Sequence, residues 1–476
     1  MTTLSLKQLQ QSRRTPPLPA KIKLTDNSSL QIDSWLRVLP GKRYVAKARW
    51  GERLVLAKLF VGPRSRRKLH REVWGSQQLD AADIATPTII EQGHDDQAAW
   101  LLTAFLSGAE DLYSMTQRTP PMLDQSLQGI ECGLSIAKQV AQLHNAQLAQ
   151  TDGHPGNFMF LDSQCYVIDC ADISESSSLA SHTDNLGQLL AQLPQSWWPA
   201  LWQAYQQSAK HATLFDDVYR AALRQLAWRG KNVADKSIRD CTQFSIAQRF
   251  DRFEAVVRGQ AEQLGPLLNN LDQVIAEGQP LKKGGSATVA KVDWRGQTLV
   301  IKRYNLKGWW HRISRWFRPT RAWHSWQGGH RLRTIGVATP KPLAMVEERF
   351  GPLRGRGYLI TECSSGLGLV NALELGDGDT LASLTAELQL LLQRFREHQI
   401  SHGDFKATNL LWDSQLSPSL SLIDLDVIRW HNNTARWRKY YQKDVSRLLR
   451  NWRDNPNVLA VLESALLVES GATTDQ

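Results

Sequence analysis

Residues 45–58 read VAKARWGERLVLAK, and residues 289–302 read VAKVDWRGQTLVIK. The two stretches align without a gap and share Val, Ala, Lys, Trp and the final Lys. In each, alternating residues are interrupted by a short turn, which predicts a β-hairpin whose second strand ends on Lys58 or Lys302. The chain therefore carries a repeated element around which the rest of the sequence can be read.

Further matches follow this repeat in the same order along the chain. They are IATP at 84–87 with VATP at 337–340, and Asp152 and Asn157 with Asp404 and Asn409. The spacing of the copies is far longer than the about 20–50 residues of a solenoid unit. The sequence therefore predicts two related domains in tandem.

Composition limits the class of protein. The 476-residue chain carries 57 Lys and Arg against 46 Asp and Glu, a formal net charge of +11, which favours an anionic partner. Its 42 % hydrophobic and 22 % charged residues are close to the globular norm.

The five cysteines form no CxxC pair and no zinc spacing, so we expect reduced thiols and no structural metal. With no signal peptide and no run of about 20 apolar residues, we expect a cytoplasmic protein, at most peripheral on a membrane.

Both copies have the same predicted order of elements. The hairpin is followed by a helix and further strands, and then by a second helix at about 127–147 or 380–398. A polar loop and a short apolar run ending in Asp come next. We therefore expect an α+β protein with two tandem domains, each a small antiparallel-sheet lobe and a helical lobe.

The predicted domain limits follow from this order. We expect an N-terminal tail at 1–29, a first domain at 30–268 that ends in helices, and a second domain at 269–476. The helical lobe of the second domain is expected to be short, with one more helix near 440–452.

The polar loops carry the residues expected to do chemistry. In copy two, residues 402–409 read HGDFKATN and residues 422–424 read LID. In copy one, residues 150–157 read QTDGHPGN and residues 167–169 read VID. The order His-x-Asp-x-x-x-x-Asn and then Asp, with a Lys on an upstream strand, is typical of kinase-like phosphotransferases.

Phosphoryl transfer explains these residue types. A strand Lys neutralises phosphate charge, Asn and Asp oxygens are hard ligands for Mg²⁺, and the loop Asp orients or deprotonates the acceptor hydroxyl. Asp and Asn also stabilise turns, which is the structural alternative for any single motif. The recurrence of the whole set, twice and in order, favours a phosphotransferase.

The sequence resembles a known family. Copy two is similar to the lipopolysaccharide kinase family of the Kdo/WaaP type through HGDFKATNLL at 402–411, SLIDLD at 421–426 and IGVATPKPLA at 335–344. Copy one resembles it through DGHPGNFMF at 152–160 and VIDCAD at 167–172. The resemblance implies phosphorylation of a lipid-linked inner-core sugar, heptose or Kdo, with ATP and Mg²⁺ at the cytoplasmic face of the inner membrane.

The resemblance also implies roles for the matching residues. In copy two these are Lys302, Gly284 and Gly285 for the nucleotide, Asp404 for catalysis, Asn409 and Asp424 for the metal, and His402 to brace the loop. In copy one they are Lys58 and Glu72 for the nucleotide, Asp152 for catalysis, and Asn157 and Asp169 for the metal.

Each copy departs from the family pattern. Kinases pair the strand Lys with a helix Glu, and Glu72 stands at that spacing in copy one. The equivalent residue in copy two is Ser325, and no acidic residue occurs between Asp293 and Glu347. Lys302 therefore lacks this partner or takes one from elsewhere.

Copy one has departures of its own. Gln150 replaces the loop His, and the phosphate-covering loop has a single glycine, Gly41, where copy two has Gly284 and Gly285. We expect both copies to bind nucleotide and favour copy two as the catalyst; one inactive copy and two working copies both stay open.

Asp184 and Asp444 each precede a leucine-rich stretch. In kinase-like folds such an Asp often braces the catalytic loop, but a helix N-cap is the simpler expectation for both.

A segment rich in basic and aromatic residues supports a separate prediction. Residues 306–327 read LKGWWHRISRWFRPTRAWHSWQ, inside a stretch without acidic residues. Trp favours the headgroup boundary, and each cation near an anionic leaflet adds about 1 kcal/mol, so the segment predicts docking on the inner-leaflet surface. The alternative is that the Trp residues pack into the fold and the Arg residues are solvated. Nucleic acid is a weaker expectation because no nucleic-acid-binding module accompanies the segment.

Two other functions stay open. A Ser/Thr/Tyr protein kinase is one, because the motif does not encode the acceptor. A pseudokinase scaffold, in which one or both copies bind nucleotide without turnover, is the other.

Overall fold

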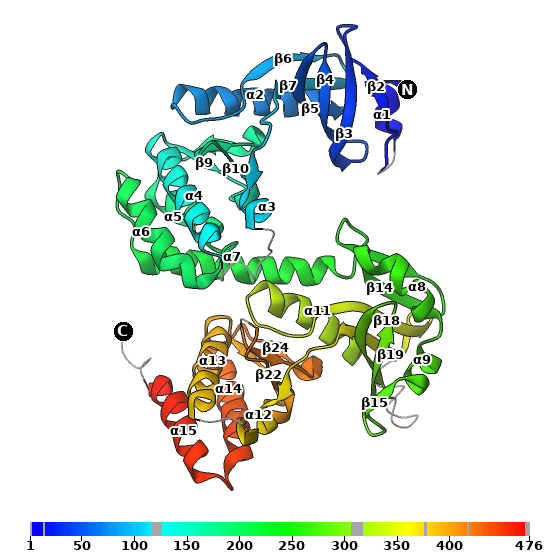
Figure 1. Ribbon diagram of the computed structural model, residues 1–476, viewed down its shortest axis with the longest axis vertical. Coiled ribbons are helices and arrows are strands. Elements are labelled where there is room, and N and C mark those ends of the chain that lie inside the picture. The colour runs from blue at the N-terminus through cyan, green and yellow to red at the C-terminus, as the bar shows by residue number, and fades with distance from the viewer. Residues whose placement is uncertain are drawn as a thin grey trace. The chain divides into compact units, whose positions relative to one another are not determined.

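The structure is a computed structural model that describes residues 2–12, 15–116, 126–305, 318–375, 378–416 and 418–471. The chain forms two compact units, Met1–Gln225 and Leu226–Gln476, coloured from blue to green and from green to red in Figure 1. Each unit contains a curled, mainly antiparallel sheet followed by a group of helices, so the predicted α+β class is confirmed.

The sheet of the first unit contains the first predicted hairpin. Its strand order is β1-β2-β3-β4-β5-β7-β6. The strands are β1 (Thr2–Ser5), β2 (Ala20–Lys23), β3 (Ser29–Leu39), β4 (Arg43–Trp50), β5 (Arg53–Val61), β6 (Ile89–His94) and β7 (Ala98–Ala104). In β4 alternate residues are buried, which places Tyr44, Ala46 and Ala48 in the core beside Trp100 of β7. The expected N-terminal tail instead contributes two strands, because β2 pairs with β3 and β1 with β2.

The other elements of the first unit are mainly helical. The helices are α1 (Leu6–Gln11), α2 (Ser65–Ala81), α3 (Leu112–Thr116), α4 (Leu127–Asn145), α5 (Leu179–Leu190), α6 (Trp198–Ser208) and α7 (Phe215–Lys236), whose last residues belong to the second unit. Short strands are β8 (Glu110–Asp111), β9 (Leu148–Gln150), β10 (Phe158–Leu161), β11 (Gln164–Val167) and β12 (Ile173–Glu175), and 3-10 turns are η2 (Pro155–Asn157), η3 (Cys170–Asp172) and η4 (Gln195–Trp197).

The sheet of the second unit repeats this plan with one change. Its order is β13-β14-β18-β19-β17-β16-β15. The strands are β13 (Phe244–Gln248), β14 (Arg252–Val257), β15 (Gln279–Lys282), β16 (Ala287–Trp294), β17 (Gln297–Tyr304), β18 (Pro342–Phe350) and β19 (Leu353–Glu362), with α11 (Arg321–Thr334) between β17 and β18. The extra pair, β13 and β14, covers the β18 edge, whereas β1 and β2 cover the β3 edge in the first unit. Both sheets thus gain two strands, on non-equivalent edges.

This pairing moves the division between the units. Residues 226–268 were expected at the helical end of the first domain, but β14 pairs with β18. The helix α8 (Ala261–Asn269) buries Leu264, Leu267 and Leu268 in the core of the second unit, and α9 (Leu271–Glu277) buries Leu271 and Ile275 there. The compact units therefore divide at 225/226, which differs from the predicted limit at 268/269.

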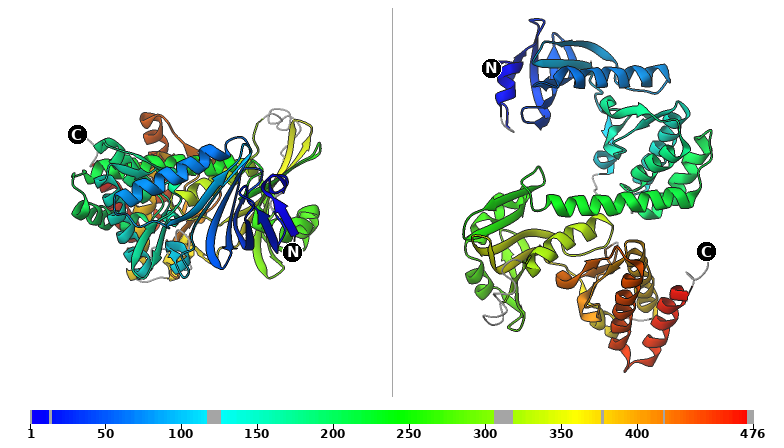
Figure 2. Two further views of the ribbon diagram at one scale, coloured as in Figure 1. Left: turned by 90° about the horizontal axis from the view of Figure 1, so that it is seen from above. Right: turned by 180° about the vertical axis from the view of Figure 1, so that it is seen from behind.

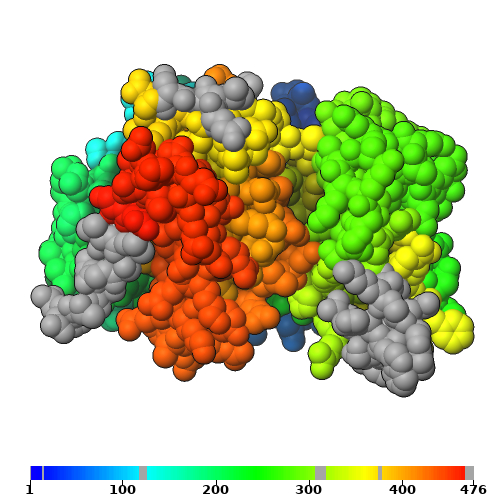
Figure 3. Space-filling view, turned by 90° about the horizontal axis from the view of Figure 1, so that it is seen from below, coloured from blue at the N-terminus to red at the C-terminus, as the bar shows by residue number. Residues whose placement is uncertain are grey.

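The helical part of the second unit contains more helix than expected. Its helices are α12 (Leu369–Leu375), α13 (Gly378–Glu397), α14 (Thr434–Leu449) and α15 (Pro456–Gly471). Its short elements are η5 (Arg258–Gln260), β20 (Leu367–Gly368), β21 (Ile400–Ser401), η6 (Ala407–Asn409), β22 (Leu410–Trp412), β23 (Leu420–Leu422), η7 (Leu425–Val427), β24 (Arg429–Trp430) and η8 (Arg450–Trp452). The red α15 lies beside α13 and α14 (Figures 2 and 3), so the lobe ends in two helices and not in one. Among the described helices, none combines the length and apolar character needed to cross a bilayer.

A close crossing fixes α2 against η3 in the first unit. A Cβ atom on Gly75 would lie 1.9 Å from the carbonyl oxygen of Cys170. In the second unit the equivalent helix, α11, carries Gly328 and Gly329, and a Cβ on Gly329 would lie 2.6 Å from Pro342 Cγ. Because only hydrogen fits at these points, each helix can approach the segment that follows the predicted metal-binding Asp.

Candidate active site

The cleft of the second unit brings Lys302 and Asp424 together. Lys302 lies on β17, paired with Val289 of β16 and Leu359 of β19. Its Nζ donates to Asp424 Oδ1, although the two residues are far apart in the sequence. Asp424 follows β23 in the left-handed conformation (φ 61°), which ends the strand and turns the chain into η7. Burial raises the pKa of Asp424, but the Lys302 ammonium more than offsets this and holds that pKa below its usual value.

The missing helix carboxylate is supplied by Asp426. Lys302 Nζ lies 2.9 Å from Asp426 Oδ1, and the same carboxylate accepts hydrogen bonds from Tyr304 Oη (2.7 Å) and Ser325 Oγ (3.0 Å). Ser325 is buried on α11, where the helix Glu was expected. The helix therefore contributes a hydroxyl, and η7 contributes the negative charge. Sequence reasoning missed Asp426, although it ends the quoted SLIDLD motif.

The loop before β22 places Asp404 beside Asn409. Asn409 Nδ2 donates to the Asp404 carbonyl (2.8 Å) and to Asp404 Oδ2 (3.3 Å). Lys406 Nζ lies 3.0 Å from Asp404 Oδ2, and Arg447 Nη1 of α14 lies 3.3 Å from Asp404 Oδ1. Two cations therefore hold the expected catalytic carboxylate. We did not predict Lys406 or Arg447; the position of Lys406 two residues after Asp404 was the available signal.

Two buried groups brace this loop. Asp444 accepts the backbone N–H of His402 (2.6 Å) and of Gly403 (3.0 Å). Burial raises the pKa of Asp444, partly offset by these N–H groups. His402 Nε2 donates to the carbonyl of Ile423 (3.0 Å), and its Nδ1 accepts the N–H of Asp404 (3.3 Å). Burial lowers the pKa of His402, which keeps the ring neutral.

The N-cap expectation for Asp444 and Asp184 was wrong. Asp444 lies inside α14, whose N-cap is Asn433. Asp184 lies inside α5, whose N-cap is Ser178, and pairs with an arginine on the surface. In the first unit the bracing group is Asn185, whose Nδ2 donates to the carbonyl of Gln150 (2.8 Å).

The cleft of the first unit has its own Lys and carboxylates. Lys58 Nζ lies 2.7 Å from Glu72 Oε2 on α2 and 3.4 Å from Asp169 Oδ1. Burial lowers the pKa of Lys58, but Glu72 and Asp169 together raise it above its usual value. Asp169 has φ 58°, so the turn after β11 matches the turn at Asp424. The structure thus places Lys58, Glu72 and Asp169 at one point.

An additional cation, Arg43, enters this first cleft. Arg43 Nη1 lies 3.3 Å from Asp169 Oδ1 and 3.9 Å from Glu72 Oε1. Arg43 begins β4, and Ala287 begins β16 at the matching position, so the second cleft has a methyl group there. Burial raises the pKa of Asp169, but Lys58 and Arg43 together lower it below its usual value. The predicted metal ligand of the first unit is therefore neutralised by two protein cations.

The loop of the first unit keeps its shape without histidine. Gln150 Nε2 donates to the carbonyl of Ile168 (3.1 Å), as His402 does to Ile423. Asn157 Nδ2 donates to the Asp152 carbonyl (2.8 Å). Within the described part of the chain no Lys or Arg is close enough to pair with Asp152, unlike Asp404. Gln150 thus preserves the loop, but the Asp152 side chain lacks the cations found around Asp404.

The glycine-containing turns predicted to cover the nucleotide phosphates also differ between the two units. Gly284 (φ 77°) and Gly285 (φ 68°) both require positive φ, and a Cβ on either would meet no heavy atom within 4 Å. The turn between β3 and β4 has Gly41 (φ 66°), close to the carbonyl of Gln10. The open two-glycine turn better suits approach of backbone N–H groups to a phosphate.

The donor set of the second cleft fits Mg²⁺. Asn409 donates through Nδ2, so its Oδ1 is the atom available to a cation, and Asp424 offers a carboxylate. In the described ranges, no group of three or more His, Cys, Asp or Glu could hold a metal ion. Mg²⁺ at phosphate sites commonly takes only one or two protein carboxylates and completes its octahedron with phosphate oxygens and water.

The tryptophan-rich segment is partly accounted for by packing. Trp326 is fully buried and donates from Nε1 to the carbonyl of Ser237 (3.0 Å), and Trp323 packs against Phe253 and Arg354. These two Trp residues therefore pack into the fold, as the alternative to membrane docking proposed. Most of the segment, 306–317, lies outside the described residues.

These features define a kinase-like cleft in the second unit, and comparison with known proteins agrees. Residues 272–460 match the Lipopolysaccharide kinase (Kdo/WaaP) family. The predicted resemblance is confirmed for this part of the chain, which contains Lys302, Asp404, Asn409 and Asp424. The match supports a phosphotransferase of the lipopolysaccharide kinase type. No curated protein sequence matches the chain significantly.

Several solved kinase structures are similar to part of the chain. WaaP in complex with acyl carrier protein has 19% identity and a TM-score of 0.31, covering 43% of this chain and 88% of that one. An aminoglycoside-3'-phosphotransferase of type VIII has 15% identity and a TM-score of 0.30, covering 39% and 90%. Vaccinia related kinase 3 has 15% identity and a TM-score of 0.25, covering 36% and 56%.

Proposed function

We propose that the chain is an ATP-dependent kinase that phosphorylates a sugar hydroxyl, on heptose or Kdo, of the lipopolysaccharide inner core at the cytoplasmic face of the inner membrane. The second unit is the catalyst. The observation that carries the proposal is the convergence of Lys302 with Asp424 and of Asp404 with Asn409, inside the segment that matches the lipopolysaccharide kinase family.

The protein groups divide the chemistry among them. Lys302, held by Asp424 and Asp426, presents an ammonium group to the nucleotide phosphates. Asp404 accepts or orients the proton of the acceptor hydroxyl, and Lys406 beside it offsets charge on the transferred group. Asn409 and Asp424 would hold Mg²⁺, which supplies charge neutralisation when bound.

The first unit is proposed as a non-catalytic partner. Arg43 and Lys58 both contact Asp169, so a divalent cation would have to displace or share that carboxylate with two resident positive charges. Copy one keeps the shape of a nucleotide cleft but offers a poor metal site. This favours the alternative of one inactive copy over two equivalent catalysts.

Direct measurement of the acceptor tests the proposal. Purified chain with ATP and Mg²⁺ should add phosphate to lipopolysaccharide inner core, read by mass spectrometry of the released oligosaccharide. Core from a strain that lacks the chain should have lost phosphate at one sugar. Unchanged core phosphate, with transfer to a protein acceptor, would favour the protein-kinase alternative; no ATP turnover at all would favour the scaffold.

Asp426→Asn tests the replacement of the helix carboxylate. The amide cannot offer Lys302 a full negative charge, and a charge-assisted hydrogen bond contributes about 1.5–3 kcal/mol, so we expect transfer to fall by about 10–100-fold. Asp454→Asn, the same change at an exposed residue of the second unit, should have no effect. Equal activities of the two variants would show that Asp426 does not serve Lys302.

Docking on an anionic inner leaflet stays a prediction of the sequence. Because Trp323 and Trp326 are used in packing, it depends on residues such as Trp309 and Trp310. Sedimentation with anionic liposomes, before and after Trp309→Ala with Trp310→Ala, measures it.

A further inference from the structure

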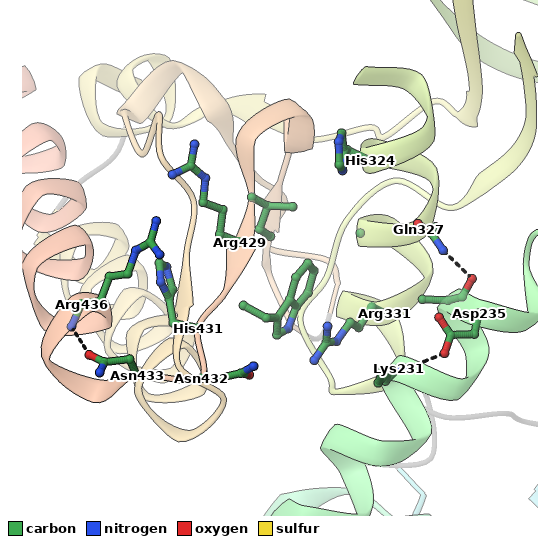
Figure 4. A pocket seen from close by; sticks show the side chains of 14 residues that line it. Lys231, Asp235, His324, Gln327, Arg331, Arg429, His431, Asn432, Asn433 and Arg436 are labelled. Atoms are coloured by element: carbon green, nitrogen blue, oxygen red, sulfur yellow. Dashed lines mark hydrogen bonds and ion pairs between the residues drawn. The ribbon is translucent and has the colours of Figure 1, made fainter. Parts of the chain in front are cut away.

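A cavity with a cationic lining lies in the second unit and contains none of the predicted site residues (Figure 4). Its volume is about 580 Å³. The end of α7, one face of α11 and the segment from β24 to the start of α14 enclose it. Its basic side chains are Lys231, His324, Arg331, Arg429, His431 and Arg436.

The charge inside this cavity is unbalanced. The only acidic residue among its lining is Asp235, which is paired with Lys231 at 2.6 Å. Three arginines remain without a carboxylate partner in the cavity. The potential there favours an anion.

Arg331 is the most informative of the three arginines. Its guanidinium stacks on Trp430, with Cζ 4.2 Å from the ring centroid, and its buried Nε has no hydrogen-bond partner in the described structure. Burial lowers the pKa of Arg331 to about 10, with Asp235 a smaller, opposing influence. Figure 4 shows Arg331 extending from α11 toward the wall that carries Arg429 and Arg436. A half-buried, stacked guanidinium of this kind suits a planar or tetrahedral oxyanion.

The start of α14 adds a second, independent attraction for anions. The helix has 16 residues and is capped by Asn433, whose side chain accepts the N–H of Arg436. Both residues line the cavity. The N-terminal end of a helix carries about half a positive charge, and it lies here beside the arginine cluster.

We propose that this cavity is a second anion site, which binds the phosphate group of a phosphomonoester or diphosphate. Arginine binds phosphate through paired N–H donors, which Arg331 presents from α11. Arg429 and Arg436 lie at exposed positions of the opposite wall, where Arg429 also stacks on Tyr440, and they add positive charge. The site is separate from the nucleotide positions, because its lining shares no residue with the set around Lys302 and Asp404. The proposal that this cavity binds an anion does not depend on the proposed sugar acceptor.

An occupied cavity would also support the catalytic loop; this consequence rests on the proposed function. His431 Nε2 lies 2.7 Å from Ser401 Oγ, one residue before His402, and β24 pairs with β21. The helix α14 carries Asp444, which holds the same loop, and α11 carries Ser325, which contacts Asp426. An anion that joins α11 to α14 would therefore tighten elements on both sides of the active site.

Calorimetric titration of the full chain with inorganic pyrophosphate, without nucleotide or Mg²⁺, tests the site. We expect saturable binding that Arg331→Gln and Arg436→Gln each weaken by about tenfold. Arg438→Gln, the same change two residues along α14 at an exposed position outside the cavity, should bind like the unaltered chain. Lys302→Met should also bind normally, because its charge belongs to the nucleotide cleft.

The results that would overturn the proposed anion site can be told apart. Loss of pyrophosphate binding in Lys302→Met alone would place the anion in the nucleotide cleft. A loss in Arg438→Gln as large as that in Arg331→Gln would show unspecific attraction. Either result overturns the proposal, as does the absence of pyrophosphate binding. Where pyrophosphate binds, vesicles containing phosphatidic acid distinguish the source of the phosphate: recruitment of the chain that Arg331→Gln weakens assigns a lipid headgroup, and no recruitment assigns a free phosphate. Hydrogen exchange at residues 400–405 should slow when pyrophosphate is bound, and unchanged exchange would overturn the link to the catalytic loop.

Discussion

Asp404→Ala is expected to lower phosphoryl transfer by about 10²–10⁴-fold, the range that a positioned general base contributes. Asp152→Ala in the first unit is expected to leave the rate within about twofold. Asp404 is held by Lys406, Arg447 and Asn409, on a loop that Asp444 fixes through backbone N–H groups. Removal of its carboxylate leaves the acceptor hydroxyl without an acceptor for its proton.

The measurement is the steady-state rate with saturating ATP and acceptor, made on the full chain. Asp404→Asn is the matched variant, because the amide keeps the size of the side chain and loses only the charge; it should be nearly as inactive as Asp404→Ala. Nucleotide affinity should be close to normal in both. A greater loss in Asp152→Ala than in Asp404→Ala would assign catalysis to the first unit, against the conclusion drawn from Arg43.

The contrast between the two units rests on one position in the sheet. Arg43 and Ala287 occupy the same register in β4 and β16. Arginine reaches Asp169 across the cleft, whereas the alanine methyl adds no charge, and Asp424 pairs with the cation Lys302, which Asp426 also contacts. We therefore expect the second cleft to be the better site for a divalent cation.

The sequence was sufficient for groups whose spacing is local. The five-residue interval from Asp to Asn spans one short loop, and the structure places Asn157 against Asp152 and Asn409 against Asp404. The spacing implied by the family resemblance pointed to Glu72 as the partner of Lys58, and the structure brings the two side chains together. Predictions of this kind need only the geometry of one element and the next.

Groups that meet through tertiary packing could not be predicted in the same way. Asp426 faces Lys302 where α11 packs on η7, and Gly328 of α11 lies close to Ile428, the residue after η7. The pairing of β14 with β18 likewise joins residues far apart in the chain, so the segment before residue 269 was placed with the wrong neighbours. Alternation shows which face of a strand is buried, but it does not specify the partner strand.

Gly75→Ala is expected to destabilise the first unit by about 3 kcal/mol, at the upper end of overpacking effects. The added methyl group would lie 1.9 Å from the carbonyl oxygen of Cys170 and 2.8 Å from its carbonyl carbon. Both are backbone atoms, so no side-chain rotation relieves the overlap. Either α2 must move away from η3, or Cys170 must shift with Asp169 beside it. A movement of α2 also carries Glu72 away from Lys58, so the loss includes a buried ion pair.

Gly265→Ala is the matched control, because it adds the same methyl group to a helix. A Cβ at Gly265 in α8 would meet no heavy atom within 4 Å apart from its chain neighbours. The helix propensity of alanine favours this variant, whereas the following Pro266 disfavours a Cβ on the residue before it, so we expect a net change within about 1 kcal/mol. Urea unfolding of the full chain measures both variants. Gly75 and Gly265 belong to different compact units, so the loss in Gly75→Ala should fall on the part of the transition that belongs to the first unit. A Gly75→Ala chain as stable as the unaltered one would mean that α2 and η3 are not in contact, and the position assigned to Glu72 beside Lys58 would fall with that contact.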